Sequence, residues 1–311
     1  MKPLLVTCYV NPDLDGVASA VAYAEFLNSQ GREAQAGILG KPHDEARYVL
    51  TRFRLPSPEE IADDKDYQEV ILVDASDLNG LEGRINQEKV IEIIDHRKVH
   101  DAGKFSRAKA QIELVGAAAT LITEKFSAAG SQISKESALL LYSAIISNTL
   151  NFKGSVTTER DRQASAWLAQ FIQVPPDYWR ELFLAKSDLA GSKLEERIRG
   201  DFAWFTLGAK RVGIAQLEII GAEDLIRQRG EEILAALEEL KADLNLDYVF
   251  QNTIELDKLR NFIIAGDKDC QELLTRVLGI EFSGCVARKD QLMMRKQIVP
   301  LIKDELERLV N

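Results

Sequence analysis

The N-terminal fold is decided by the stretch Leu4-Leu5-Val6-Thr7-Cys8-Tyr9-Val10-Asn11-Pro12-Asp13-Leu14-Asp15-Gly16. Residues 4–9 form a short apolar run that is rich in β-formers, which predicts a strand. The segment 11–16 then breaks this run with turn-forming residues, and a helical pattern follows from Val17 to about Ser29. The stretch therefore predicts a strand–loop–helix unit that carries two carboxylates, Asp13 and Asp15, in its loop.

The same alternation continues along the first half of the chain. Further strands are predicted at 33–39, 70–74 and 90–95, and helices at about 117–126, 135–150 and 158–172. Continuous apolar strands that alternate with helices are typical of a parallel sheet covered on both faces. The sequence predicts an α/β fold whose N-terminal domain is a doubly wound, mainly parallel sheet.

The second half has its own set of elements, which predicts a smaller C-terminal α/β domain. Strands are expected at 211–220, 248–255, 261–265 and 282–287, and helices at 222–242, 269–278 and 297–310. The segment 186–193 is small and polar, as expected of a linker. The predicted organisation is a metal-binding catalytic domain at 1–185, a linker at 186–193 and a substrate-binding domain at 194–311.

Composition excludes several classes of protein. The 311 residues carry a formal net charge of −10, with a pI near 5.1, so long nucleic acid is not an expected partner. The three scattered cysteines form no disulfide framework. No signal peptide is recognisable, and no apolar run reaches the ~20 residues of a membrane span. We expect a cytoplasmic protein with no membrane partner.

Three predicted strands end in acids, which supply Asp13 and Asp15, then Asp74, then Asp95 with His96. Ligands of open α/β sheets bind beyond the carboxyl ends of the strands, and converging acids are tolerated mainly when a cation lies among them. Oxygen ligands with one imidazole suit Mg²⁺ or Mn²⁺. Each group taken alone is also compatible with a structural role. The loop of Asp13 and Asp15 is compatible with a capped turn, Asp74 with a simple loop acid, and His96 with a buried core histidine.

These residues belong to motifs that together resemble the DHH phosphoesterase superfamily, and most closely the family II inorganic pyrophosphatases. Two further motifs match near residues 113–120 and 143–153. The basic segments 287–289 and 296–300 look like the substrate-binding motif of the family's second domain. The resemblance covers nearly the whole chain.

The resemblance implies two domains with the active site in the cleft between them, and two metal ions that share Asp74. It implies catalytic roles for Asp13, Asp15, Asp74, His96 and Arg97. The metal ligands would be Asp13, Asp15, Asp74 and His96, with Asn148 as a weak ligand, Tyr9 hydrogen-bonded outside the coordination sphere, and Asp95 orienting the site. The substrate-binding residues would be Arg97, Lys193, Arg288, Lys289 and Lys296. The cofactor would be Mn²⁺ or Mg²⁺, as one or two ions.

Three positions depart from the family pattern. Tyr9 stands where the family has a histidine ligand, Asn148 stands in place of an aspartate ligand, and Arg97 replaces the second histidine of the Asp-His-His triplet. The exopolyphosphatase-related branch of the superfamily also carries Asp-His-Arg. We expect the first metal position to bind weakly, and Arg97 either to bind a phosphoryl oxygen or to pair with a nearby acid such as Asp95.

The leading functional hypothesis is hydrolysis of a small phosphoanhydride, pyrophosphate or short polyphosphate, by a metal-activated water. One alternative is a phosphodiesterase that acts on short oligonucleotides or cyclic dinucleotides, although the glycine-rich motif of those branches is missing. The other is a binder of phosphorylated ligands that has lost turnover, which Tyr9 and Asn148 motivate. Family members are often homodimers, so a homodimer is also expected.

Overall fold

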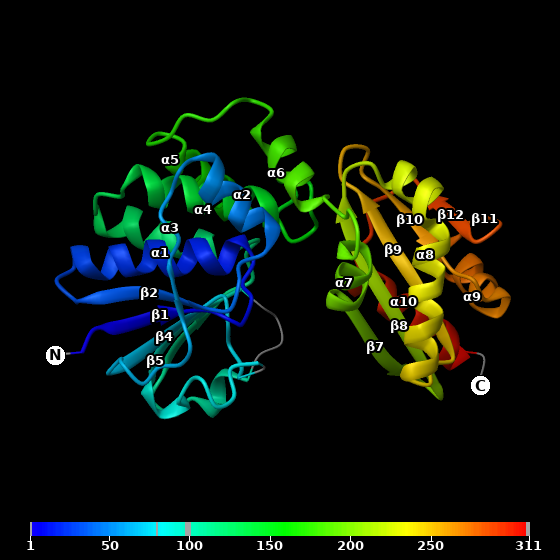
Figure 1. Ribbon diagram of the computed structural model, residues 1–311, viewed down its shortest axis with the longest axis horizontal. Helices are drawn as coiled ribbons and strands as arrows, with labels where there is room; N and C mark the ends of the chain where they lie inside the picture. Colours follow the sequence, from blue (N-terminus) through cyan, green and yellow to red (C-terminus); the bar gives the residue numbers. More distant parts are fainter. Residues whose placement is uncertain (1, 79, 97–100, 309–311) are drawn as a thin grey trace. The chain divides into compact units, whose positions relative to one another are not determined.

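The computed structural model describes residues 2–78, 80–96 and 101–308. The chain divides into two compact units, Met1–Ala185 and Lys186–Asn311 (Figure 1). Arg97, which the sequence analysis assigns to catalysis and substrate binding, lies outside the described residues. Within the described part, no helix is both long enough and apolar enough to cross a membrane.

The first unit is built on a six-stranded sheet in the order β3-β2-β1-β4-β5-β6, and every neighbouring pair is parallel. The strand order reverses at β1, whose neighbours are β2 and β4, and such a switch point is where α/β sheets bind ligands. The strands are β1 (Leu4–Thr7), β2 (Ala34–Leu39), β3 (Glu59–Ile61), β4 (Glu69–Val73), β5 (Val90–Asp95) and β6 (Lys109–Ile112).

Both faces of this sheet are covered, but in different ways. The α-helices gather on one face, where α1 packs against α3 and α4 over residues such as Val6 and Ile71 (Figure 1). The other face is covered by loops and the short 3₁₀ helices η1 (Gln87–Lys89) and η2 (Ala102–Lys104), which bury Leu5 and Leu72. The helices are α1 (Leu14–Ser29), α2 (Asp44–Arg52), α3 (Ala118–Ala129), α4 (Lys135–Asn148), α5 (Glu159–Leu168) and α6 (Tyr178–Lys186).

The predicted parallel sheet is confirmed, while the start of one helix and the set of short elements in this unit need correction. The helix expected from Val17 begins at Leu14, because the Asp13 side chain caps its first turn. The short elements α2, α6, β3 and β6 were not predicted. Both strands lie at the sheet edges and carry polar residues, so they lack the continuous apolar run of the central strands.

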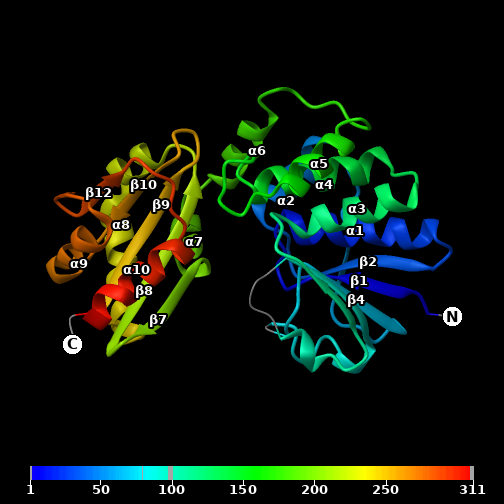
Figure 2. The ribbon, with the colours of Figure 1, turned by 180° about the vertical axis from the view of Figure 1, so that it is seen from behind.

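The second unit is a six-stranded mixed sheet in the order β11-β12-β10-β9-β8-β7, in which only the pair β8–β9 is parallel among the described residues. Helices α7 and α8 cover one face, and α9 and α10 cover the other (Figure 2). Its strands are β7 (Phe202–Leu207), β8 (Lys210–Ile219), β9 (Tyr248–Glu255), β10 (Arg260–Ile264), β11 (Phe282–Ser283) and β12 (Val286–Lys289). Its helices are α7 (Lys193–Gly200), α8 (Ala222–Asp243), α9 (Lys268–Leu278) and α10 (Arg295–Arg308).

Here too the α/β class is confirmed while details differ. The single strand predicted at 282–287 is a hairpin, since Gly284 adopts a left-handed conformation with φ +63° between β11 and β12. As a result Arg288 and Lys289 lie within β12, not after a strand as predicted. The segment proposed as a linker joins α6 to α7, and Lys193 at its end is the first residue of α7.

Candidate metal centre

The loop after β1 is organised by the carboxylate of Asp13. Its Oδ1 accepts hydrogen bonds from the backbone N–H groups of Asp15 and Gly16, at 2.9 and 3.0 Å, and so caps the first turn of α1. The hydroxyl oxygen of Tyr9 accepts the N–H of Asp13 at 3.0 Å. This short network fixes the direction in which α1 begins, and with it the position of Asp15.

Asp15 is completely buried and meets the start of α3. Its Oδ2 accepts the N–H of Ala118 at 2.8 Å, and its Oδ1 accepts the N–H of Ala119 at 2.9 Å. The positive end of the helix dipole also favours a negative charge at this place. Asp15 is therefore held from two sides, by its own helix and by the N-terminus of α3.

Asp74 follows β4 and adopts a left-handed backbone conformation with φ +51°. A non-glycine residue in this region is strained by on the order of 1 kcal/mol, and such residues cluster at functional sites. Its N–H donates to the carbonyl of Ile94 at 2.8 Å, which ties it to the end of β5. The turn holds the side chain of Asp74, which is buried like that of Asp15, beside His96.

The imidazole of His96 completes the cluster. Its Nδ1 lies 3.0 Å from the carbonyl oxygen of Val115, while Nε2 lies 3.4 Å from Asp74 Oδ1 and 3.7 Å from Asp15 Oδ2. A ring nitrogen bonded to a backbone carbonyl fixes the imidazole tautomer, as in known metal sites. One ligand atom each from Asp15, Asp74 and His96 lies within 4.8 Å of the other two.

Asp95 is fully buried and is joined to this cluster through the backbone of His96. Its Oδ1 accepts the backbone N–H of His96 at 2.7 Å, and its Oδ2 accepts the hydroxyl of Ser76. The orienting role that the resemblance implies for Asp95 stays a prediction, for which these contacts supply a route through the backbone of His96. Ser76, which carries no such signal in the sequence, is added to the site by the structure alone.

The electrostatics of the cluster favour a bound cation. Burial, together with the negative charge of Asp74, raises the pKa of Asp15 well above its usual value. Burial opposes a charge on His96, but its hydrogen bond to Asp74 and the charges of Asp74 and Asp15 raise its pKa to about 10. Burial and the Asp13 and Asp74 carboxylates keep the Tyr9 phenol protonated by raising its pKa. The residues fit a divalent cation, which would relieve this repulsion.

Asn148 lies at the last position of α4 and reaches the same cluster. Its Nδ2 donates a hydrogen bond to Asp15 Oδ2 at 2.9 Å. The chain then turns sharply, with Leu150, Asn151 and Phe152 all in the left-handed region. Asn148 therefore holds Asp15 through its amide nitrogen, and its role as a metal ligand stays a prediction.

The basic residues assigned to the substrate lie in different settings within the second unit. Lys193 pairs with Asp188, and exposed Arg288 pairs with Asp290 at 2.9 Å. Lys289 donates to the carbonyl of Leu278 at 2.7 Å, at the end of α9. Lys296 near the start of α10 is exposed, and within the described chain no acid lies within ion-pair distance of it. Partial desolvation lowers its pKa, against the opposing charge of Glu218.

The segment that leads into α10 is anchored by a buried amide network that the sequence analysis missed. Asn261 Oδ1 accepts the N–H of Met293 at 3.0 Å, and Asn252 Nδ2 donates to the Met293 carbonyl at 2.9 Å. Gln216 Oε1 accepts the N–H of Arg295 at 2.7 Å. Gln216, Asn252 and Asn261 stand inside predicted strands, and this was the available sequence signal. Buried amide groups require hydrogen-bond partners, so polar residues at such positions indicate a buried network.

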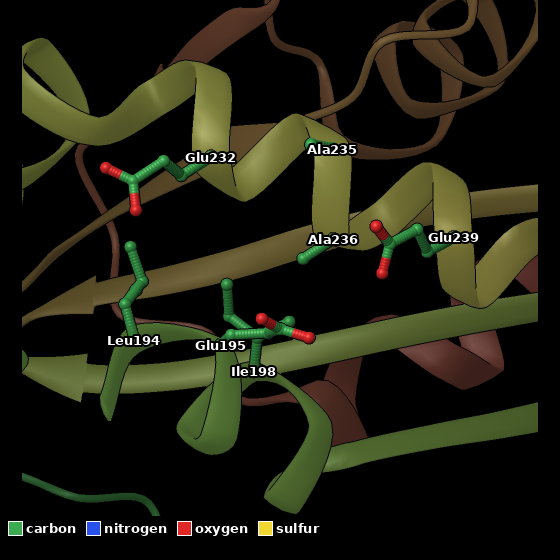
Figure 3. A pocket seen from close by; sticks show the side chains of 7 residues that line it. All are labelled: Leu194, Glu195, Ile198, Glu232, Ala235, Ala236 and Glu239. Atoms are coloured by element: carbon green, nitrogen blue, oxygen red, sulfur yellow. The ribbon is translucent and has the colours of Figure 1, made fainter. Parts of the chain in front are cut away.

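A shallow depression between α7 and α8 of the second unit is a separate feature (Figure 3). Three carboxylates, Glu195, Glu232 and Glu239, stand around apolar Leu194, Ile198 and two alanines. Each carboxylate is paired with an arginine, either Arg199 or Arg229. No basic residue is among those that line the depression, so it is not a candidate for binding a phosphate group.

Comparison with known proteins agrees with this architecture. The family model described as "DHH family, N-terminal domain" matches residues 3–145, and the model described as "DHHA2 domain" matches residues 180–305. The first match contains the strand-end acids and His96, and the second contains all six strands of the mixed sheet.

Curated relatives match over nearly their whole length. A probable manganese-dependent inorganic pyrophosphatase of an Exiguobacterium species is 33% identical, over 98% of this chain and 99% of its own. The manganese-dependent inorganic pyrophosphatase of Bacillus subtilis is 30% identical, again over 98% and 99%. A Methanococcus jannaschii crystal structure, described as that of a "putative family II inorganic pyrophosphatase", superposes with a TM-score of 0.74 at 29% identity, and the match covers 97% of this chain and 98% of that chain.

Proposed function

The chain belongs to the family II, manganese-dependent inorganic pyrophosphatases, and from this membership we propose that it hydrolyses inorganic pyrophosphate with Mn²⁺ as its metal. The observation that carries the proposal is the convergence of Asp15, Asp74 and His96 at the switch point of a parallel sheet. Short polyphosphate is the second substrate that we propose.

We propose the following roles for the side chains of the metal centre. The carboxylates of Asp15 and Asp74 and Nε2 of His96 would hold a divalent cation, and Asp13 would contribute a further carboxylate. When bound, such cations act as Lewis acids and lower the pKa of water toward neutrality. Val115 and Asp95 orient His96 through its ring and its backbone, so the ligand geometry exists before the substrate arrives.

The cations of the second unit are our candidates for binding the phosphoryl oxygens. Among the described members of the set, Lys296 has the strongest claim, because Arg288, Lys289 and Lys193 already have partners. Arg97 is proposed for the same task on its sequence position alone. A charged donor to a phosphoryl oxygen contributes about 1.5–3 kcal/mol.

A second candidate function is the binding of a phosphorylated ligand without turnover. It is favoured by one observation: Asn148 presents a neutral donor to Asp15. A site with one fewer negative charge holds Mn²⁺ less tightly and polarises a substrate less.

The test is phosphate release by the purified protein from pyrophosphate, tripolyphosphate and a dinucleotide, each with Mn²⁺ and Mg²⁺ in parallel. We expect turnover of pyrophosphate with Mn²⁺. Turnover of the dinucleotide alone would favour a phosphodiesterase. Tight binding of pyrophosphate without turnover under either metal would favour the non-catalytic alternative.

We also propose a cytoplasmic location and a homodimeric state, for which the sequence is the only support. Size-exclusion chromatography with light scattering distinguishes a dimer from the monomer mass of 34.8 kDa.

A further inference from the structure

Two of the three clustered ligands are held by one short stretch of backbone, residues 115–119, which we name the backbone clamp. The carbonyl of Val115 holds His96 Nδ1, and the N–H groups of Ala118 and Ala119 hold the two oxygens of Asp15. A displacement of the clamp would therefore move His96 and Asp15 together. What holds the clamp in place becomes important for the metal centre.

The clamp is held by Asp161, which lies on helix α5 and outside the metal centre. Asp161 is completely buried, and both of its carboxylate oxygens accept the N–H of Gly116, at 2.9 and 3.0 Å. It also accepts the Thr120 hydroxyl at 2.6 Å, and the N–H and hydroxyl of Thr158 at 2.6 and 2.7 Å. One carboxylate thus ties the middle of the clamp and the start of α3 to the start of α5.

The close approach at Gly116 supports the same conclusion. A Cβ at this position would lie 2.5 Å from Thr149 Cγ2 and 2.9 Å from Asp161 Oδ2. Only glycine fits between these side chains without a shift. Thr149 follows Asn148 directly, so the clamp is wedged between α5 and the end of α4, which carries the donor to Asp15.

We propose that Asp161 is a positioning residue for the metal centre: it fixes the backbone clamp, and through the clamp it sets the distance between His96 and Asp15. Asp161 does not touch the metal-binding atoms, and nothing in its sequence context marks it beyond a helix start. The inference deepens the proposed function, since it concerns the same site, and it predicts a property that can be measured without turnover.

The experiment is a calorimetric titration of Mn²⁺ into the full-length protein and into Asp161→Asn. The amide would present a donor to the N–H of Gly116 or to the Thr158 groups, and this conflict would displace the clamp. Substitution of a residue that hydrogen-bonds a metal ligand typically lowers metal affinity by about 10- to 100-fold. We expect Asp161→Asn to weaken Mn²⁺ binding by a factor of that size. The imidazole ¹⁵N resonance of His96 should shift as well, because its bond to Val115 changes.

The matched control is Thr158→Ala. It removes the cap of α5 and one bond to Asp161, while the contact between Asp161 and Gly116 stays. We expect a lower melting temperature but nearly unchanged Mn²⁺ affinity. If both variants lose stability equally and both keep wild-type Mn²⁺ affinity, Asp161 is merely structural and the proposal is overturned.

Gly116→Ala provides an independent test if Asp161→Asn does not fold. It pushes the clamp away from Asp161 and Thr149 without removing a charge. Weakened Mn²⁺ binding would support the proposal, and wild-type affinity in the folded variant would refute it. A wild-type protein that binds Mn²⁺ but does not hydrolyse pyrophosphate would refute the proposed function alone, because the effect of Asp161 on Mn²⁺ affinity is measured separately.

Discussion

The candidate metal centre of the first unit and the basic residues of the second unit are held in different ways. Asp15 and Asp74 are buried, and one stretch of backbone, residues 115–119, holds both Asp15 and His96. Exposed Arg288 and half-buried Lys193 each form a surface ion pair. Lys296 is exposed and has no acid within ion-pair distance among the described residues. Mutually repelling acids need a rigid scaffold, whereas long cationic side chains reach an anion by their own flexibility.

The strongest test of this contrast is Asp74→Asn. The substitution removes a buried charge from a position with a left-handed backbone conformation. Each tenfold loss in rate corresponds to about 1.4 kcal/mol of transition-state stabilisation. Since metal ions contribute several kcal/mol, we expect pyrophosphate turnover to fall by about 1000-fold or more. Phosphate release is the measurement, with exposed Asp290→Asn as the control. Residual turnover within tenfold of wild type would contradict a central role for Asp74.

Lys296→Ala tests the other side of the comparison. Loss of a charged donor to a phosphoryl oxygen should reduce kcat/KM for pyrophosphate by about 10- to 100-fold. The affinity for Mn²⁺ in calorimetry should not change, because the metal ligands belong to the first unit. Lys289→Ala is the matched control: its ammonium is already bound to Leu278, so it should lower stability by about 1 kcal/mol and leave kcat/KM nearly unchanged. The reverse ranking of the two lysines would refute our assignment.

Asn148→Asp makes the metal centre more acidic and so sharpens the contrast. A carboxylate would replace a donor that lies 2.9 Å from Asp15. We expect Mn²⁺ affinity to rise about fivefold, which corresponds to about 1 kcal/mol. The metal-free protein should melt at a lower temperature, because two carboxylates then repel each other. Unchanged affinity for Mn²⁺ would show that Asn148 does not contribute to the metal centre. Asn148→Ala is the control, because it removes the hydrogen-bond donor to Asp15 without adding a charge.

The last prediction concerns the pH dependence of stability. In metal-free protein the pKa of His96 is raised to about 10, mainly by its hydrogen bond to Asp74 and the charges of Asp74 and Asp15 acting against burial. A raised folded-state pKa stabilises the protein fully below the unfolded value of about 6.5, and this stabilisation disappears as pH rises toward 10. The free energy of unfolding in chelator should therefore decline across this window. The decline should be weaker in His96→Gln, and an identical slope would contradict the coupling.

Sequence periodicity was sufficient for the central strands and long helices of both units. The spans of β5 and β9 agree with the prediction residue by residue, because their apolar runs are continuous and bounded by polar turns. The edge strands β3, β6 and β7 were missed. Edge strands are partly exposed and carry mixed side chains, so their pairing depends on a neighbour that the local sequence does not reveal.

The sequence by itself determined the residue types of the metal centre, since acids at the ends of parallel strands have to meet at one edge of the sheet. It also determined the departures at Tyr9 and Asn148. Only the tertiary structure decided how these groups are held. The amide nitrogen of Asn148 donates to Asp15, and a ring nitrogen of His96 bonds to a backbone carbonyl. The backbone clamp is held by Asp161 of a helix that is distant in the sequence. Hydrogen bonds to backbone groups leave no residue pattern in a sequence, because every residue except proline offers the same N–H and C=O.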